Sequence, residues 1–176
     1  IDQTDYLARN TSMTGTFGKF MDFQEGAYGM AILTNKPLIS SRVLHLPDGK
    51  YEPRVAIVQE VQLAKACTIT FANVHFEWIS GSEGSTNRLK QAKTLVKYID
   101  ELNQPTIITG DFNCTPDSPT MQYFKEQDFV FVPKGIDNLS FQGEEKMEID
   151  QLIYRNTEKV KFKKKSLQLL NEPIVS

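Results

Sequence analysis

The alternation of hydrophobic and polar positions divides the chain into short strands and one long helix. Residues 39–46 and 55–63 have the pattern of two strands joined by a turn at 47–51, and Cys67–His75 follows as a third. A β-branched run at residues 106–109 is typical of a buried strand. Strands in this number, together with a helix between the last two, predict an α/β fold.

Residues 88–102 carry the helical pattern. Apolar side chains recur there every three or four positions, which places them on one face of a helix. Ser85 and Thr86 are the candidate N-cap residues. Arg88 falls on the opposite face with three lysines, and we interpret that face as solvated surface. The order strand, helix, strand predicts two strands of one sheet that present their ends to one cleft.

Asp111 and Asn113 follow the buried run at 106–109 directly. Gly110 relaxes the backbone at the end of that strand. Side chains alternate along a strand, so we expect Asp111 and Asn113 to emerge on the same side, just past its end. A carboxylate there can activate a water or hold a cation, and an amide can contact phosphate or complete a cation's oxygen shell. The alternative is a strand that ends in an ordinary Asx turn.

The strand Cys67–His75 ends in polar groups on the face that carries Ile69 and Phe71. Asn73 and His75 share the parity of those apolar residues. A face that changes from apolar residues to Asn and His is expected to leave the core and enter a site. We therefore take His75 as catalytic and Asn73 as substrate-binding.

Asp150 begins an apolar strand pattern near the C-terminus. A carboxylate in such surroundings is costly unless it is paired or hydrogen-bonded, so we expect Asp150 to be at least half-buried and functional. A carboxylate of this kind commonly orients a histidine. The alternative is an exposed aspartate at the start of the strand.

Residues 23–29 have the composition of a loop. Gly26 and Gly29 would allow a ligand to approach the backbone there. Tyr28 is a candidate substrate contact in this loop, although support of the loop is an equal alternative.

Five segments in order resemble the motifs of the endonuclease/exonuclease/phosphatase superfamily of metal-dependent phosphodiesterases and phosphatases. Each motif alone is weakly specific, and their common order and spacing make the resemblance strong. The segments are 29–38 (Gly-Met-Ala-Ile-Leu-Thr-Asn-Lys-Pro-Leu), 72–76 (Ala-Asn-Val-His-Phe), 87–92 (Asn-Arg-Leu-Lys-Gln-Ala), 110–113 (Gly-Asp-Phe-Asn) and 149–154 (Ile-Asp-Gln-Leu-Ile-Tyr).

The resemblance implies two packed β-sheets flanked by helices, the four-layer sandwich of deoxyribonuclease-like proteins. It also implies hydrolysis of a phosphoester with Mg²⁺ or Mn²⁺. Asp111 would orient or deprotonate the attacking water, and Asn113 would hold phosphate or a cation. His75 would donate to phosphate oxygens, and Asp150 would orient a further histidine.

Two elements of the family pattern are not found in residues 1–176. An early strand with a metal-binding glutamate would precede Ile1, and a terminal Asp-His would follow residues 173–176. We therefore expect one domain over 1–176 that lacks the first strands and the terminal Asp-His segment. The main metal ligand would lie upstream, with Asp111 and Asn113 as further candidates. We therefore expect the full-length protein to be a metal-dependent phosphoric ester hydrolase and residues 1–176 alone to be inactive.

The composition excludes few classes of substrate or partner. The chain is 40% hydrophobic with a net charge of −2, which favours a globular protein and does not indicate a dedicated nucleic-acid binder. No apolar run approaches the roughly 20 residues that span a bilayer. We expect a monomer acting on nucleic acid, an inositol or sugar phosphate, or a phospholipid head group. Localisation is left open, and the alternative function is a non-catalytic binding or scaffold domain with the same fold.

Overall fold

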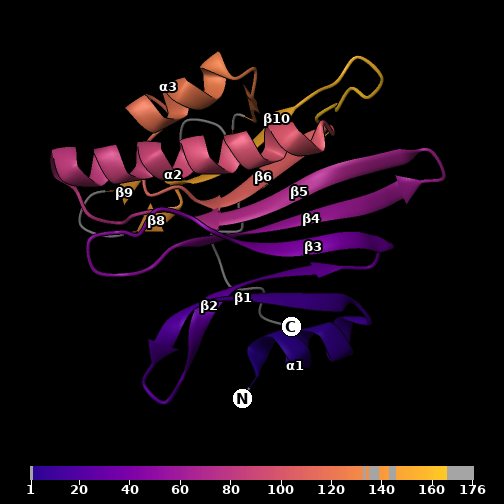
Figure 1. Ribbon diagram of the computed structural model, residues 1–176, viewed down its shortest axis with the longest axis horizontal. Helices are drawn as coiled ribbons and strands as arrows, with labels where there is room; N and C mark the ends of the chain where they lie inside the picture. The colour runs from indigo at the N-terminus through magenta and orange to yellow at the C-terminus, as the bar shows by residue number, and fades with distance from the viewer. Residues whose placement is uncertain (1, 133, 135–138, 143–145, 166–176) are drawn as a thin grey trace.

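A six-stranded sheet forms the centre of the computed structural model (Figure 1). The structure describes residues 2–132, 134, 139–142 and 146–165, so residues 173–176, after which the terminal Asp-His was expected, lie outside the described residues. The strands of the sheet run in the order β3 (Leu38–His45), β4 (Val55–Ala64), β5 (Cys67–His75), β6 (Thr106–Asp111), β10 (Asp150–Arg155) and β7 (Val130–Phe131).

The pairing within this sheet is mixed. β5 and β6 are parallel, and the other neighbouring strands pair antiparallel. The parallel pair is joined by the helix α2 (Gly81–Leu102), as the order strand, helix, strand predicted. A parallel pair needs such a crossover, so the chain between β5 and β6 covers one face of the sheet.

The main hydrophobic core lies between the sheet and its helices. α2 and α3 (Pro119–Glu126) lie on the same face of the sheet (Figure 1). Leu95 and Ile99 of α2 have no exposed surface, and full burial of such a side chain contributes about 1.5–3 kcal/mol. On the sheet, this core contacts the residues of β5 and β6 whose parity is opposite to that of His75, among them Val74 and Ile108.

A second, two-stranded sheet packs on the opposite face. It consists of β1 (Thr14–Phe23) and β2 (Gly26–Thr34), and α1 (Gln3–Thr11) lies beyond it (Figure 1). The two sheets approach closely, because a Cβ added to Gly18 would lie 2.7 Å from Cγ1 of Ile57. Helices, sheet, sheet and helix give the four layers that the family resemblance implied. A short hairpin, β8 (Phe141–Gln142) with β9 (Lys146–Met147), precedes β10.

The expected loop at 23–29 is wrong. β1 continues to Phe23, and β2 begins at Gly26, so Gln24 and Glu25 alone make the turn. Both have positive φ, at 46° and 62°, which is the backbone of a type I′ hairpin turn. The Gln-Glu pair lacks the Asn or Gly that usually marks such a turn, so its composition concealed the hairpin.

The expected N-cap of the long helix is also wrong. α2 begins at Gly81 with Ser80 at the N-cap position, well before Ser85 and Thr86. Gly81 and Gly84 have weak helix propensity and concealed the first turn. Packing requires a glycine at position 84, where an added Cβ would lie 1.8 Å from the carbonyl oxygen of Ile79.

Arg88 does not lie on a solvated face, which corrects a second expectation for this helix. The residue is 8% exposed, and its Nη1 donates to the carbonyl oxygens of Glu77 at 2.9 Å and Ile79 at 2.8 Å. Arg88 thus satisfies backbone groups of the loop that leads from β5 into α2.

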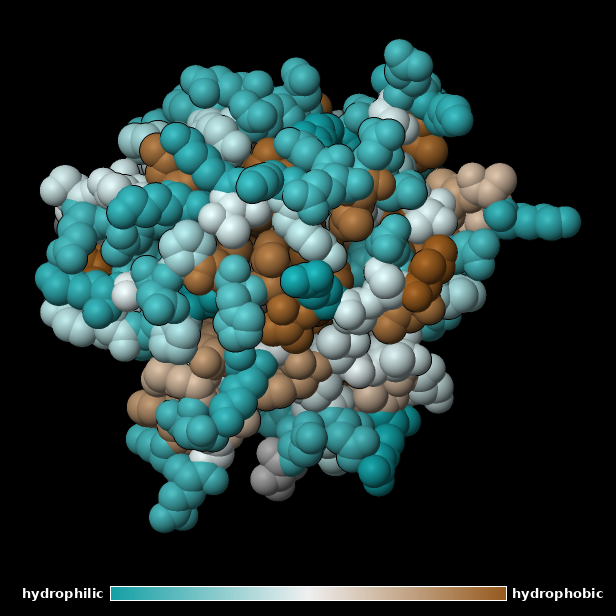
Figure 2. Space-filling view, viewed as in Figure 1, coloured by the Kyte–Doolittle hydropathy of each residue, from teal (hydrophilic) through white to brown (hydrophobic). Residues whose placement is uncertain are grey.

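The visible surface is mainly hydrophilic. Figure 2 shows hydrophilic residues over the helix layer and hydrophobic residues gathered near the middle of the same face. Within the described part of the chain, no helix has both the length and the hydropathy to cross a membrane.

Gly110 is predicted to be the least replaceable glycine near the end of β6. Its φ is +132°, and an added Cβ would lie 2.0 Å from the carbonyl oxygen of Val74. Gly110→Ala should lower the free energy of unfolding by about 3 kcal/mol or more, through backbone strain and the clash together. Chemical denaturation measures this loss. Gly26→Ala is the control, because its added Cβ meets nothing closer than 3.6 Å; equal losses for the two variants would contradict the prediction.

Candidate active site

The predicted site residues lie together at the edge of the six-stranded sheet where β5 and β6 end and β10 begins. In the parallel pairing of β5 and β6, His75 lies beside Asp111. β10 runs antiparallel to β6, so its first residue, Asp150, also lies beside Asp111. The strand ends therefore bring three side chains together that are far apart in the sequence.

His75 and Asp111 lie on the same face of the sheet, as their parity predicted. The His75 Nε2 and Asp111 Oδ2 atoms are 3.7 Å apart, which is beyond hydrogen-bond distance. Both side chains are about three-quarters covered, at 27% and 29% exposure. They remain open enough to contact a ligand and are shielded enough for burial to affect their charges.

Asn113 follows Asp111 through an Asx turn. Its backbone N–H donates to Asp111 Oδ1 at 2.8 Å, and its φ is +50°. Its Nδ2 donates to the carbonyl oxygen of Phe76 at 3.0 Å, which leaves its Oδ1 as the acceptor. The Asx turn, which was the alternative interpretation of these two residues, is therefore present, and it holds the Asp111 carboxylate and the Asn113 backbone in place. The turn is compatible with a functional role for both residues, which stays a prediction.

Burial sets the protonation states of the central pair. Desolvation raises the pKa of Asp111 to about 6; the hydrogen bond from Asn113 opposes this rise, and the Asp150 charge adds to it. Desolvation and the Arg54 charge lower the pKa of His75 to about 4. At neutral pH the imidazole is therefore neutral and the carboxylate is mainly ionised. Such displaced pKa values in two adjacent groups are typical of functional sites.

Asp150 is exposed, and this corrects the expectation that it is at least half-buried. The desolvation argument fails because the residue sits at the first position of β10, at the open edge of the sheet. Asp150 nevertheless acts on the pair, since its charge raises the pKa values of both Asp111 and His75.

Asn73 and Tyr28, the two candidate substrate contacts, have partners within the protein. Asn73 Nδ2 donates to the carbonyl oxygen of Ala31 at 3.2 Å, which ties β5 to the two-stranded sheet. The Tyr28 ring packs edge-on against Phe20 at 5.3 Å between centroids, and Phe20 lies 5.9 Å from the His75 ring. Tyr28 therefore packs on Phe20, which in turn lies against the His75 ring.

Arg54 is a charged residue of the site that the sequence analysis missed. It directly precedes β4, and its side chain has no exposed surface. The Nη2 atom lies 3.0 Å from Glu52 Oε2, but none of its three nitrogens has a hydrogen-bond partner of good geometry among the described residues. Its charge lowers the pKa values of both His75 and Asp111. The only sequence signal was an arginine placed against an apolar strand.

Glu77 is a second buried charge that the sequence did not reveal. It is 1% exposed, and its carboxylate accepts hydrogen bonds from the backbone N–H groups of Lys50, Trp78 and Ile79. Burial opposes ionisation, yet these bonds hold its pKa below the usual range. Glu77 thereby joins the loop before β4 to the loop after β5.

The residues at this edge fit part of a Mg²⁺ or Mn²⁺ shell. Asp111, Asp150 and the free Oδ1 of Asn113 offer oxygen, the donor that hard cations prefer. No cluster of three or more His, Cys, Asp or Glu side chains suited to a metal occurs among the described residues. Mg²⁺ is commonly held by one or two carboxylates together with water and substrate phosphate, so the donor set is chemically suitable.

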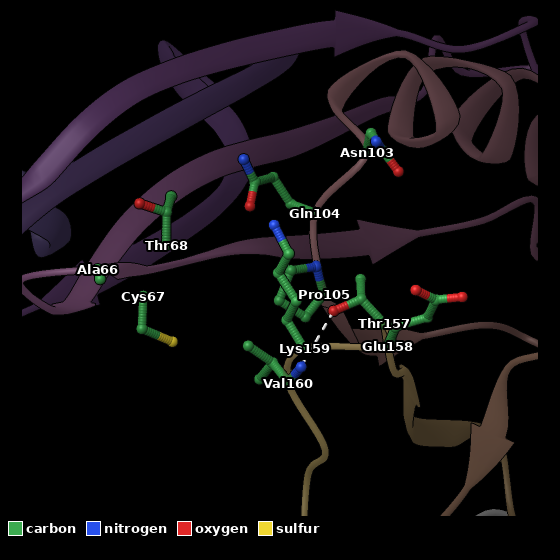
Figure 3. A pocket seen from close by; sticks show the side chains of 10 residues that line it. All are labelled: Ala66, Cys67, Thr68, Asn103, Gln104, Pro105, Thr157, Glu158, Lys159 and Val160. Carbon is green, nitrogen blue, oxygen red and sulfur yellow. Dashed lines mark hydrogen bonds between the residues drawn. The ribbon is translucent and has the colours of Figure 1, made fainter.

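A separate cavity lies at the opposite edge of the sheet. It has a volume of about 470 Å³ and is lined by residues next to the starts of β5 and β6 and after the end of β10 (Figure 3). Thr157 Oγ1 accepts a hydrogen bond from the Val160 N–H at 3.2 Å there. None of the predicted site residues lines this cavity.

A model of the family described as "Endonuclease/Exonuclease/phosphatase family" matches residues 4–165. None of the curated proteins matches the chain.

Solved structures share the fold at low sequence identity. The human Nocturnin catalytic domain with bound sulfate is 20% identical with a TM-score of 0.71, and the match covers 88% of this chain and 64% of that one. ANGEL2, a 2′,3′-cyclic phosphatase in complex with adenosine-2′,3′-vanadate, is 16% identical with a TM-score of 0.71, covering 88% and 66%. An endonuclease/exonuclease/phosphatase from Bacteroides vulgatus is 20% identical with a TM-score of 0.67, covering 86% and 67%. The chain thus spans about two thirds of the length of these structures.

The opposed pKa values predict an unusual pH dependence of stability. The proton on Asp111 stabilises the fold fully below the usual pKa of 3.8, and this contribution is lost as the pH rises through about 6. Neutral His75 contributes stability above 6.5, which is lost as the pH falls toward 4. The two contributions oppose each other between pH 4 and 6.

Asp111→Asn should reveal the contribution of His75 to the pH dependence of stability, because it removes the opposing contribution of Asp111. The stability of the variant, measured by urea denaturation, should rise more steeply than that of the wild type between pH 4 and 6. His75→Gln in the Asp111→Asn background should remove the added slope. Parallel curves for wild type and Asp111→Asn would show that Asp111 titrates normally.

Proposed function

We propose that this chain, which belongs to the endonuclease/exonuclease/phosphatase family, contributes the groups that hydrolyse a phosphoester where β5 and β6 end and β10 begins. The observation that carries the proposal is the pair His75 and Asp111, half-buried, 3.7 Å apart and with pKa values displaced in opposite directions. A purely structural pair has no need of a carboxyl poised close to neutral pH.

Asp111 is assigned to the attacking water. A pKa of about 6 leaves the carboxylate mainly ionised at neutral pH and still basic enough to accept a proton. The Asx turn fixes Oδ1 through the Asn113 N–H, so Oδ2, which faces His75, is the oxygen available to orient or deprotonate water. Asp150 raises the basicity of this group from the neighbouring strand.

His75 is assigned to the phosphoryl oxygens as a neutral hydrogen-bond donor. Its low pKa keeps it from carrying a charge of its own at neutral pH, so it stabilises developing negative charge through its N–H. Phe20 packs against the ring and limits its rotation. Asn113 donates from Nδ2 to the carbonyl oxygen of Phe76, the residue after His75, and keeps Oδ1 as an acceptor.

Mg²⁺ or Mn²⁺ would be held by Asp111 and Asn113, with Asp150 close by. When bound, such a cation would neutralise charge on the phosphoryl group and the leaving oxygen. The acidic groups at this edge would otherwise repel a phosphate, which supports the need for a cation. The substrates named for the structural neighbours, such as the 2′,3′-cyclic phosphate of ANGEL2 and the mannosyl-6-phosphate of a Bacteroides thetaiotaomicron phosphatase, make phosphoesters the class to test.

The rival proposal is a binding or scaffold domain without activity. A panel of nucleotide, inositol, sugar and phospholipid phosphoesters, assayed with Mg²⁺ and again with a chelator, separates the two. Release of product that stops on chelation supports the enzyme. Absence of hydrolysis on every member of the panel favours the scaffold.

Asp111→Asn should lower turnover on the best substrate by about 10²-fold or more, because a general base is removed while shape is kept. The measurement is kcat at saturating substrate and Mg²⁺. Unchanged circular dichroism would establish that the variant folds. Turnover within a few-fold of the wild type would exclude Asp111 from the chemistry.

Arg54→Met should shift the pH profile and not merely reduce activity. Removal of the buried cation should raise the pKa of Asp111 further, so the acidic limb of kcat/KM should move to higher pH. Methionine keeps much of the buried volume. Arg155→Met is the matched control, since Arg155 pairs with Asp100 at 2.7 Å, far from this edge at the other end of β10. A uniform loss with an unmoved profile would make Arg54 a packing residue only.

A further inference from the structure

Two aromatic side chains stand exposed in the loops that precede β4 and follow β5. Tyr51 is 69% and Trp78 is 51% exposed, and their ring centroids are 6.3 Å apart with a tilt of 35°. The Lys50 ammonium lies 5.6 Å from the centroid of the Tyr51 ring. Two neighbouring large rings exposed to water mark a surface whose burial by a ligand is favourable.

The two rings come from different loops that one buried residue holds together. Tyr51 lies in the loop before β4 and Trp78 in the loop after β5. Glu77 Oε2 accepts the Lys50 N–H at 2.6 Å, and Oε1 accepts the Trp78 N–H at 2.9 Å. Gln91 adds a second link, because it accepts the Glu77 N–H and donates to the Pro47 carbonyl, each at 2.9 Å. Both loops are fixed before any ligand arrives, which lowers the entropy cost of binding.

Trp78 also borders a cavity that reaches Asn113. The cavity has a volume of about 450 Å³, within the range of small-molecule sites, and Asn113 is part of its lining. Most of its exposed wall area is apolar, and Phe141, Met147 and Ile149 contribute to it. A substrate whose phosphate lies at Asp111 and Asn113 would extend its remaining part into this cavity and onto the Trp78 ring.

We propose that this cavity and the Tyr51–Trp78 ring pair bind the nucleobase of a nucleotide substrate, an inference that rests on the proposed phosphoester hydrolysis. A base has flat faces that stack on aromatic rings and polar groups only at its edges. A sugar or inositol would need hydrogen-bond partners around its hydroxyls, and apolar walls leave most of those unmet. The ion pairs Lys50–Glu83 at 2.8 Å and Arg54–Glu52 at 3.0 Å balance positive with negative charge beside the rings, whereas binding to an anionic membrane surface relies on clustered basic residues.

Matched ligands test the base directly. Adenosine 5′-monophosphate and ribose 5-phosphate share the sugar and the phosphate, and only the first has a base. We expect the nucleotide to bind more tightly by calorimetry and to change the fluorescence of Trp78, identified as the signal that Trp78→Phe loses. Trp78→Ala should weaken nucleotide binding by about 5- to 150-fold, the range for stacking of one base, and leave ribose 5-phosphate unaffected.

Further variants separate stacking from folding. Trp78→Phe and Tyr51→Phe keep a ring and should retain most of the affinity, whereas Tyr51→Ala should weaken it. Tyr6→Ala is the control for an exposed tyrosine, because Tyr6 lies in α1 and is 61% exposed. Equal binding of the two ligands, or the same loss for Tyr6→Ala as for Tyr51→Ala, would overturn the proposal.

Other ligands distinguish a nucleobase from a sugar or a lipid in this cavity. Mannose 6-phosphate binding as tightly as the nucleotide would assign the cavity to sugars, and quenching of Trp78 by neutral phosphatidylcholine vesicles would assign it to lipid; either result overturns the nucleobase. Nucleotide binding without hydrolysis of any phosphoester would keep the subsite and reject the enzyme. Hydrolysis with no preference for the base would keep the enzyme and reject the subsite.

Discussion

The parallel register between β5 and β6 determines where every candidate catalytic group lies. Val74 pairs with Gly110 and His75 with Asp111, so the two functional side chains leave the sheet at the same level and on the same face. A shift of one residue would turn Asp111 toward the helices and Phe112 toward the site. The close approach of Gly110 to the Val74 carbonyl supports this register, because only a glycine fits there. The antiparallel strand β10 then adds Asp150 to the same edge.

Local sequence patterns sufficed for the parts of this arrangement that depend on strand parity. The alternation from Ile69 to His75 predicted which face the histidine occupies, and the apolar run before Gly110 predicted the strand that carries Asp111. Parity works here because both faces of the sheet are covered, one by helices and one by the hairpin. The beginning of α2 and the hairpin turn escaped prediction, because close packing at Gly84 and positive φ at Gln24 and Glu25 override weak local preferences.

The buried charges could not be predicted, since their partners are distant in sequence or belong to the backbone. Glu77 bonds to the N–H of Lys50, 27 positions earlier, and Arg88 bonds to carbonyl groups of a loop. Helical periodicity assigned Arg88 to the surface because periodicity describes only the helix itself. Arg54 was concealed in the same way: its effect on His75 and Asp111 arises from the sheet, where the start of β4 lies beside the end of β5.

The opposing charges around Asp111 have a chemical consequence. Burial and Asp150 raise its pKa, while Arg54 and the Asn113 N–H lower it, and the balance is a carboxyl poised near neutrality. The same burial and the same arginine remove charge from His75. One environment therefore produces a base and a neutral donor side by side. The segment after β5 connects this pair to the surface. The Phe76 N–H donates to the Asp111 carbonyl oxygen, and the Phe76 carbonyl oxygen accepts from Asn113. Glu77 joins two loops, and Trp78 is exposed. Because consecutive residues make these contacts, the backbone fixes the spacing between Asp111 and the segment that carries Trp78. Under the proposed function, this spacing sets the length of a substrate that can contact both.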